Sequence, residues 1–284
     1  MPAPDSVPVA VSVVVPVRDD AVRLAACLDA LHRQVGAPAF EVVVADNGST
    51  DASAAVARAH PLGPVVVVEP RRGSYAARNA ALSVARGTLV GFTDADCVPA
   101  PDWVAQGAAA LAVHEVVGGA VRPVRSASPS VWERYDCAVY LRQQEVVAQQ
   151  RYAATADLWV RREVLDRVGG FDPALLSSGD LEWGRRAEAA GSRTAYVDEV
   201  VVGHAPRTTA RQTWRLHRRL GAGWAVLGLR EGVWLPLGMV IDALAADGRP
   251  LRRRQVAHVH AVAMAARRAG WIAQSTRRRA RTDP

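Results

Sequence analysis

Four short runs rich in valine lie in the first third of the chain, and they constrain the fold more than any other feature. The runs are Val11–Val15, Glu41–Ala45, Val65–Glu69 and Leu89–Phe92. Near-continuous valine in the first run is typical of a strand buried on both faces of a parallel sheet. Segments with helical spacing separate the runs; in residues 21–34, for example, the leucines recur every three or four positions. Repeated strand and helix with short loops predict a parallel sheet with right-handed crossovers.

The fourth run ends in two carboxylates, Asp94 and Asp96, with one residue between them. Residues two apart in an extended backbone point to the same side, and open α/β sheets bind ligands at the carboxyl ends of their strands. Two carboxylates there form a hard oxygen site suited to Mg²⁺ or Mn²⁺ shared with substrate phosphates. The alternative is an ordinary acidic turn after a strand.

Polar residues at the ends of the second and third strands favour the metal site over the ordinary turn. Asp46 follows the second strand, and the third is followed by Arg71, Arg72, Arg78 and Asn79. A carboxylate for a base, arginines for phosphates and a carboxylate for a metal together describe a nucleoside diphosphate site. Taken singly, Arg71 and Arg72 are better explained as exposed residues, and Arg78 could be a surface helix residue, but the whole set favours the site.

Two widespread nucleotide-binding motifs are absent from the sequence. Gly-x-Gly-x-x-Gly does not follow the first strand, which argues against a dinucleotide-binding Rossmann domain. Gly-x-x-x-x-Gly-Lys is also absent, and the chain contains no lysine. A P-loop enzyme is therefore excluded as well.

Three motifs in the first hundred or so residues carry a resemblance to the family 2 glycosyltransferases. They are Val13–Arg18, Val43–Asp51, and Gly73–Asn79 followed by Phe92–Asp96. The resemblance implies a GT-A fold, an α/β fold with a Rossmann-like, mostly parallel sheet flanked by helices. It also implies an inverting transfer of sugar from a nucleoside diphosphate sugar, with Mn²⁺ or Mg²⁺ as cofactor.

On this match, the expected donor-binding residues lie in the three motifs, except for Arg72, which directly precedes Gly73. They are Pro16, Val17, Arg18, Asp46, Arg72, Arg78, Asp94 and Asp96. Pro16 and Val17 line the base pocket together with Asp46, which bonds the base edge. Arg78 lies near the base and the diphosphate, Asp94 contacts the ribose or the sugar, and Asp96 holds the metal.

The second half of the chain resembles the acceptor side of the family. Asp157 stands where the family usually carries an amide or a small polar residue. Asp180 stands in the family's acidic motif, without the usual preceding glutamate, and the match makes it the general base, with Glu182 as runner-up. A carboxylate serves this role within hydrogen-bond reach of the hydroxyl. The alternative is that Asp180 only caps the next helix. Trp183 either stacks on an acceptor sugar or packs in the core.

His204 follows a predicted strand, residues 200–203, downstream of the acidic motif. The family often has a histidine there for the metal or the diphosphate, so the expected metal residues are Asp96 and His204. A structural histidine is the alternative. Residues 130–150 are predicted to form one long helix.

From residue 209 onward the sequence predicts helices, at 214–220, 224–246 and 252–279, and a strongly basic character. Residues 249–284 contain ten arginines and one acid. Such a tail suits an anionic partner, either a membrane surface or nucleic acid, and a solvated tail without a partner is the alternative. The apolar, tryptophan-bearing residues before it suit a membrane interface, packing against the catalytic domain or a homodimer contact. No run is long enough to span a membrane. The domain prediction is a catalytic domain over residues 1–208, with halves of about 1–100 and 101–208, and a helical extension over 209–284.

We therefore expect a metal-dependent, inverting glycosyltransferase that uses a UDP-, GDP- or dTDP-sugar and a hydroxyl acceptor, lipid-linked or soluble. Its setting would be cell-envelope polysaccharide, glycolipid or natural-product glycosylation. The scattered cysteines and a start without signal-peptide features suggest a cytoplasmic protein, peripheral on the inner membrane face if the tail binds lipid. No nucleic acid partner is expected. The alternatives are a sugar-1-phosphate nucleotidyltransferase, which should have a glycine-rich basic loop after the first strand, and a non-catalytic surface-binding relative.

Overall fold

The computed structural model describes residues 9–228 and 253–282. The chain divides into two compact units. The first, here called the sheet unit, comprises Met1–Arg122, Gln143–Ala174 and Asp180–His204. The second, the helical unit, comprises Pro123–Arg142, Leu175–Gly179 and Ala205–Pro284. The predicted domain boundary at residue 208 stays a prediction.

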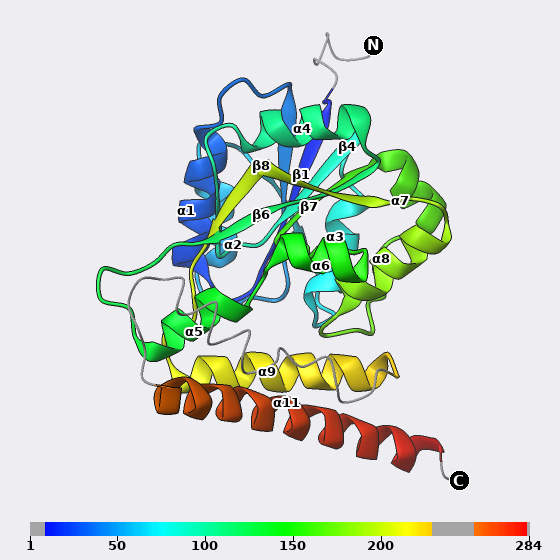
Figure 1. The fold of residues 1–284 in the computed structure, drawn as a ribbon. Helices are drawn as coiled ribbons and strands as arrows, with labels where there is room; N and C mark the ends of the chain where they lie inside the picture. Colours follow the sequence, from blue (N-terminus) through cyan, green and yellow to red (C-terminus); the bar gives the residue numbers. More distant parts are fainter. Residues whose placement is uncertain (1–8, 229–252, 283–284) are drawn as a thin grey trace, which may run out of the picture. The chain divides into compact units, whose positions relative to one another are not determined.

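An eight-stranded sheet forms the centre of the sheet unit (Figure 1), in the order β3-β2-β1-β4-β7-β6-β8-β5. The strands are β1 Val11–Val17, β2 Phe40–Asp46, β3 Val65–Val68, β4 Leu89–Thr93, β5 Cys97–Pro99, β6 Val116–Pro123, β7 Asp157–Arg161 and β8 Thr194–His204. The neighbours β3, β2, β1 and β4 pair in parallel, as the sequence predicts. The rest of the sheet is not parallel, because β7 runs antiparallel to β4 and to β6, and β5 antiparallel to β8.

Helices flank this sheet (Figure 1), so the predicted α/β class is confirmed. They are α1 Ala21–His32, α2 Ser53–Ala59, α3 Ser74–Leu82, α4 Trp103–Val113, α6 Gln143–Gln150, α7 Arg162–Val168 and α8 Gly179–Ala189. Every residue of β1 is buried, which accounts for its valine content. β3 is an edge strand, and its end residues Val65 and Val68 are exposed.

The helical unit contains α5 Val131–Val139, α9 Ala210–Val226 and α11 Arg253–Thr282. Tyr135 of α5 packs with Val256, Val259 and Ala263 of α11 in a small apolar core. Among the described residues, no helix is both long and apolar enough to cross a bilayer.

Two helix predictions are wrong in their boundaries. The single helix predicted over 130–150 is two helices, because the chain turns at Leu141, where φ is +50°. The helix predicted over 214–220 belongs to the longer α9, which a capping box of Thr209 and Gln212 starts earlier. It continues through Gly221, where a side chain would collide with the carbonyl of Arg267 in α11. Most of the helix predicted over 224–246 lies outside the described residues.

Candidate functional site

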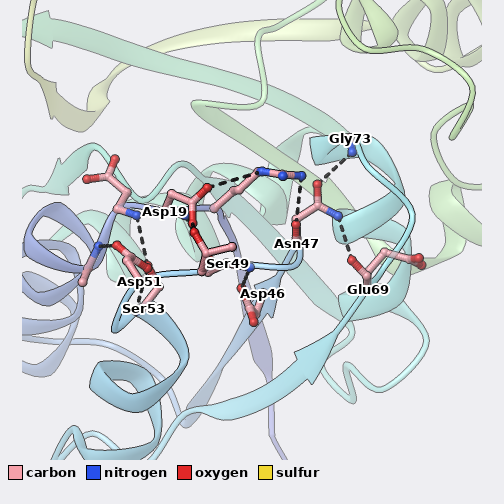
Figure 2. A network of polar contacts seen from close by, with 12 residues as sticks. Asp19, Asp46, Asn47, Ser49, Asp51, Ser53, Glu69 and Gly73 are labelled. Atoms are coloured by element: carbon pink, nitrogen blue, oxygen red, sulfur yellow. Dashed lines mark hydrogen bonds and ion pairs between the residues drawn. The ribbon is translucent and has the colours of Figure 1, made fainter.

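The loops that follow β1 and β2 are tied together by hydrogen bonds (Figure 2). The Asp19 carboxylate accepts from the backbone amide of Thr50 at 2.6 Å and from its hydroxyl at 3.0 Å. Asp51 accepts from the amide of Ala21, and the hydroxyl of Ser53 accepts from the amide of Asp20, each at 3.0 Å. These bonds satisfy amides at the start of α1 that the helix itself leaves unpaired, and they fix the edge where β1 and β2 end.

Asn47 joins this edge to the loop that follows β3 (Figure 2). Its amide nitrogen donates to the carbonyls of Glu69 at 2.9 Å and Arg71 at 2.7 Å, and its side-chain oxygen accepts from the amide of Gly73 at 2.8 Å. Asn47 is 4% exposed, so these three bonds satisfy a buried amide. The sequence analysis missed this residue, although it lies inside the motif Val43–Asp51.

The residues predicted for the base pocket lie together at the end of β1 and β2. Pro16 and Val17 are buried, and Val17 is in register with Asp46 on the neighbouring strand. One oxygen of the Asp46 carboxylate accepts from the amide of Ser49 at 2.9 Å, which orients the side chain. Arg18 is exposed and donates to the carbonyl of Asn47 at 3.3 Å.

Of the predicted arginines, Arg78 is the one most firmly held. It lies on α3, is 2% exposed, and forms an ion pair with Asp94 at the end of β4. Its Nε atom is buried without a hydrogen-bond partner in the described part of the chain. Arg72 is exposed, whereas Arg71 is occupied by a two-point pair with Glu69. Arg78 and Asp94 therefore pair with each other at this edge, a contact that the sequence analysis did not predict.

Asn79, which the sequence analysis grouped with the arginines after the third strand, makes its hydrogen bonds away from them. Its side chain exchanges hydrogen bonds with the backbone of Phe171, at 2.7 and 2.9 Å. A side chain on Gly170 would collide with Asn79. Asn79 therefore holds the segment before α8 in place, which is a structural role.

Asp96 and His204 lie next to each other, as the match predicted. Antiparallel pairing of β5 with β8 puts Cys97 opposite His204, so Nε2 of His204 is 3.6 Å from Oδ2 of Asp96. Nη1 of Arg23, on α1, is 3.7 Å from the same oxygen. The sequence analysis did not single out Arg23.

The Asp96 carboxylate is a suitable ligand for Mn²⁺ or Mg²⁺, although Asp96 and His204 together are too few to enclose a metal. No group of three or more His, Cys, Asp or Glu side chains placed for a metal occurs within residues 9–228 and 253–282. Mg²⁺ in particular is commonly held by one or two carboxylates, with substrate phosphates and water supplying the other ligands. The residues present fit a metal that is shared with a diphosphate.

Asp180 lies at the start of α8 and faces α3. Its Oδ1 atom accepts from the hydroxyl of Tyr75 at 3.3 Å and from the amide of Leu181 at 3.0 Å. Burial raises the pKa of the Asp180 carboxyl above its ordinary value, and the Leu181 amide, the charge of Arg78 and the Tyr75 hydroxyl offset part of this rise. A carboxylate with a raised pKa is a stronger base.

The other residues predicted for catalysis or for the acceptor are either occupied by an ion pair or buried. Glu182 forms a two-point ion pair with Arg186, at 2.6 and 3.0 Å. Trp183 is 1% exposed and donates to the carbonyl of Gly169, so it packs in the core, which was one of its two predicted roles. Asp157 has no exposed surface and accepts from Nε1 of Trp103 at 2.9 Å.

Burial raises the pKa of Asp157 well above its ordinary value, which favours the uncharged form of this side chain inside the sheet. The acceptor-side position expected of it does not match this geometry, because a fully buried carboxyl has no surface on which a sugar can bind. The physical reason is the strand: Asp157 is the first residue of β7, which pairs inside the sheet with Thr93 of β4.

Comparison with known proteins gives a consistent result. Residues 12–169 match the model of glycosyl transferase family 2. Glycosyltransferase AglE of Haloferax volcanii is 32% identical over 204 residues, which are 69% of this chain and 67% of that protein. The pre-mycofactocin glycosyltransferase of Mycobacterium tuberculosis is 28% identical over 78% of this chain and 48% of its own length.

Among solved structures, the mannosyltransferase PcManGT of Pyrobaculum calidifontis, in complex with GDP-Man and Mn²⁺, aligns with a TM-score of 0.65 at 25% identity. The alignment covers 93% of this chain and 86% of PcManGT. S. aureus TarS, residues 1–349, aligns at a TM-score of 0.55 and 19% identity over 95% of this chain and 92% of TarS, which supports the fold alone.

Proposed function

This chain belongs to glycosyl transferase family 2, and we propose that it transfers a sugar from a nucleoside diphosphate sugar to a hydroxyl acceptor with inversion, assisted by a divalent metal. The observation that carries this proposal is the arrangement at the ends of β2, β4 and β8. Asp96 lies beside His204, and the buried Arg78 forms an ion pair with Asp94 while its charge offsets part of the rise that burial causes in the pKa of the base candidate Asp180.

On this proposal the residues at this edge divide the steps of the reaction among them, and the inversion is what the family resemblance implies. The carboxylate of Asp180 takes the proton from the acceptor hydroxyl as its oxygen forms a bond to the anomeric carbon. The bond from that carbon to the diphosphate oxygen breaks on the opposite face, so the configuration inverts. Asp96 and His204 would hold a divalent metal, which would stabilise the negative charge on the departing diphosphate.

Arg78 adds a fixed positive charge close to both carboxylates. It is buried and paired with Asp94, so its guanidinium is held before the donor binds. A preorganised cation of this kind costs little reorganisation when charge develops on the leaving group. Asp94 orients Arg78 and in turn contacts the ribose or the sugar.

The solved structures of similar proteins suggest which donors to test. PcManGT binds GDP-Man and Mn²⁺, and TarS structures hold UDP and UDP-GlcNAc, so GDP and UDP sugars are the first donors to test, and dTDP sugars stay in the test as the third donor that the sequence analysis expected. The acceptor is a hydroxyl compound of cell-envelope polysaccharide, glycolipid or natural-product synthesis. A lipid-linked acceptor would account for the basic helical unit.

The helical unit is suited to an anionic membrane surface. Helices α9 and α11 contain twelve arginines and no acidic residue. The α9 arginines Arg211, Arg215, Arg218 and Arg219 are exposed, and Trp214 on the same face is 39% exposed. Arginine with tryptophan is typical of helices that lie at a lipid headgroup layer. On this proposal the enzyme works at the cytoplasmic face of a membrane; a homodimer contact is the competing use of these helices.

Donor binding tests the proposal. The protein is titrated with UDP-, GDP- and dTDP-sugars, with and without Mn²⁺, and its melting temperature is followed, since a ligand that binds only the native state raises it. We expect one nucleotide to raise the melting temperature in a metal-dependent way, and Asp96→Ala to lose that effect. If no donor stabilises the protein, or if Asp96→Ala responds as the wild type does, the metal-assisted reaction at this edge is refuted.

A further inference from the structure

Arg23, in the first turn of α1, is held by Asp20, a residue whose type and position would ordinarily make it the cap of the helix. Asp20 occupies the residue before the helix, where an aspartate commonly caps the free amides, but its side chain makes no capping bond. Instead its two oxygens bind Arg23, with Nε to Oδ1 at 2.9 Å and Nη2 to Oδ2 at 2.6 Å. The amide of Ala21 is satisfied by Asp51 from the next loop.

This two-point pair sets the plane of the Arg23 guanidinium. Nη1 lies outside the pair, and it is the atom that faces Asp96, 3.7 Å from Oδ2. That oxygen is also the one 3.6 Å from Nε2 of His204. The Arg23 side chain is 53% exposed, so a ligand from solution can reach it.

A guanidinium beside a carboxylate changes how that carboxylate binds a metal. Arginine stays protonated and has no lone pair to give, so Arg23 cannot be a ligand. Its positive charge neutralises Asp96 and repels a second cation at the same oxygen. A bound diphosphate removes this repulsion, because its negative charge attracts both the metal and the Arg23 guanidinium.

We propose that Arg23 neutralises Asp96 in the donor-free protein and binds the diphosphate of the donor once the metal has arrived with it. This inference rests on the proposed function, since it takes Asp96 as a metal ligand. The metal then enters as its complex with the nucleotide, and free metal binds poorly. Asp20 is the positioning residue that keeps Arg23 pointed at the metal site.

The test measures two affinities in the full-length protein. Binding of Mn²⁺ alone is followed by the electron paramagnetic resonance signal of the free ion, and binding of UDP, GDP and dTDP in excess Mn²⁺ by calorimetry. We compare wild type with Arg23→Gln, and with Arg33→Gln as a matched control, an exposed arginine at the other end of α1. Arg23→Lys keeps the charge and loses the two-point pair.

The inference predicts changes of opposite sign. Arg23→Gln should bind Mn²⁺ alone about threefold or more tightly, because one positive charge next to Asp96 is removed. It should bind the preferred nucleoside diphosphate about tenfold more weakly, the size expected for the loss of a hydrogen bond to a charged group. Arg23→Lys should resemble wild type with Mn²⁺ alone and weaken the nucleotide, and Arg33→Gln should change neither.

A structural role for Arg23 would weaken both ligands together, and an idle surface residue would change neither; each of these results overturns the inference. Asp96→Ala separates this failure from failure of the proposed function. If Asp96→Ala loses Mn²⁺ and nucleotide binding while Arg23→Gln shows no opposite shifts, only the role of Arg23 is wrong. If Asp96→Ala binds both ligands like wild type, the metal site itself is wrong, and the inference falls with it.

Discussion

Replacing Asp180 with asparagine removes the proposed base while changing little else. The described hydrogen bonds to Asp180 both fall on Oδ1, from Tyr75 and Leu181. In Asp180→Asn the amide oxygen can keep both bonds, and the NH₂ group then replaces Oδ2, which is the oxygen left to take the proton. A positioned general base typically contributes about 10²- to 10⁴-fold to a rate, so turnover should fall by about that factor while donor affinity stays within about twofold.

The raised pKa of Asp180 predicts a second effect of Asp180→Asn, on the stability of the fold, which should increase while turnover falls. Because burial raises the pKa of Asp180 in the folded protein, the carboxyl favours the native state below the ordinary pKa of an aspartate. That contribution is lost as the pH rises through the raised value. At neutral pH the buried charge is therefore a cost, and Asp180→Asn should raise the melting temperature as it lowers turnover.

The pH profile of kcat/KM supplies the control. Only the ionised carboxylate acts as a base, so the rate should fall on the acid side at a higher pH than for an ordinary aspartate. Tyr75→Phe removes a hydrogen bond that lowers this pKa, and the acid limb should move to still higher pH. The assay is release of nucleoside diphosphate with the donor and acceptor found by screening. Turnover of Asp180→Asn above about a tenth of wild type would refute Asp180 as the base.

Other substitutions test the remaining assignments. Glu182→Gln should leave turnover within about twofold, because Glu182 is occupied by Arg186; a loss of a hundredfold would make Glu182 the base. Trp183→Ala should lower the free energy of unfolding by about 3–5 kcal/mol in urea titrations, as expected for a buried tryptophan; a near-neutral result would contradict its place in the core. Replacing Arg211 and Arg215 by glutamine should weaken co-sedimentation with vesicles of anionic lipid about thirtyfold and leave donor binding unchanged. Equal sedimentation of both proteins would count against membrane contact through α9.

The parallel half of the fold was predictable because its signals are local. Valine runs and helical spacing mark β1 to β4 and their helices, and short loops leave few other topologies. The break at Leu141 was not predictable in this way, because a leucine with positive φ gives no sequence signal. The continuity of α9 through its glycines was missed for a similar reason, since close packing of Gly221 against α11 and of Gly223 against Ser177 outweighs the low helix propensity of glycine.

The candidate site was predicted in part, through its motifs. Asp96 and His204 were expected together and lie together, whereas their roles stay predictions. Asp157 was placed on the acceptor side because the motif gives a position in the chain and no information on burial. Arg23 was missed because nothing in its neighbourhood of the sequence distinguishes it from a solvent-exposed helix residue; the contact with Asp96 exists only after α1 packs beside β5.

The pairing of β5 with β8 has a consequence for how the enzyme is made. Asp96 leaves the ribosome early, and His204 follows only after the acceptor half has been synthesised. On the proposed assignments, a nascent chain that has assembled β1 to β4 would carry the proposed nucleotide-base contacts before the second proposed metal ligand, His204, has been synthesised. Because synthesis is slow compared with the folding of small structural units, the growing polypeptide would pass through a stage that recognises a nucleotide and cannot yet use it. The proposed metal site is complete only after β8, which ends at His204, has been synthesised.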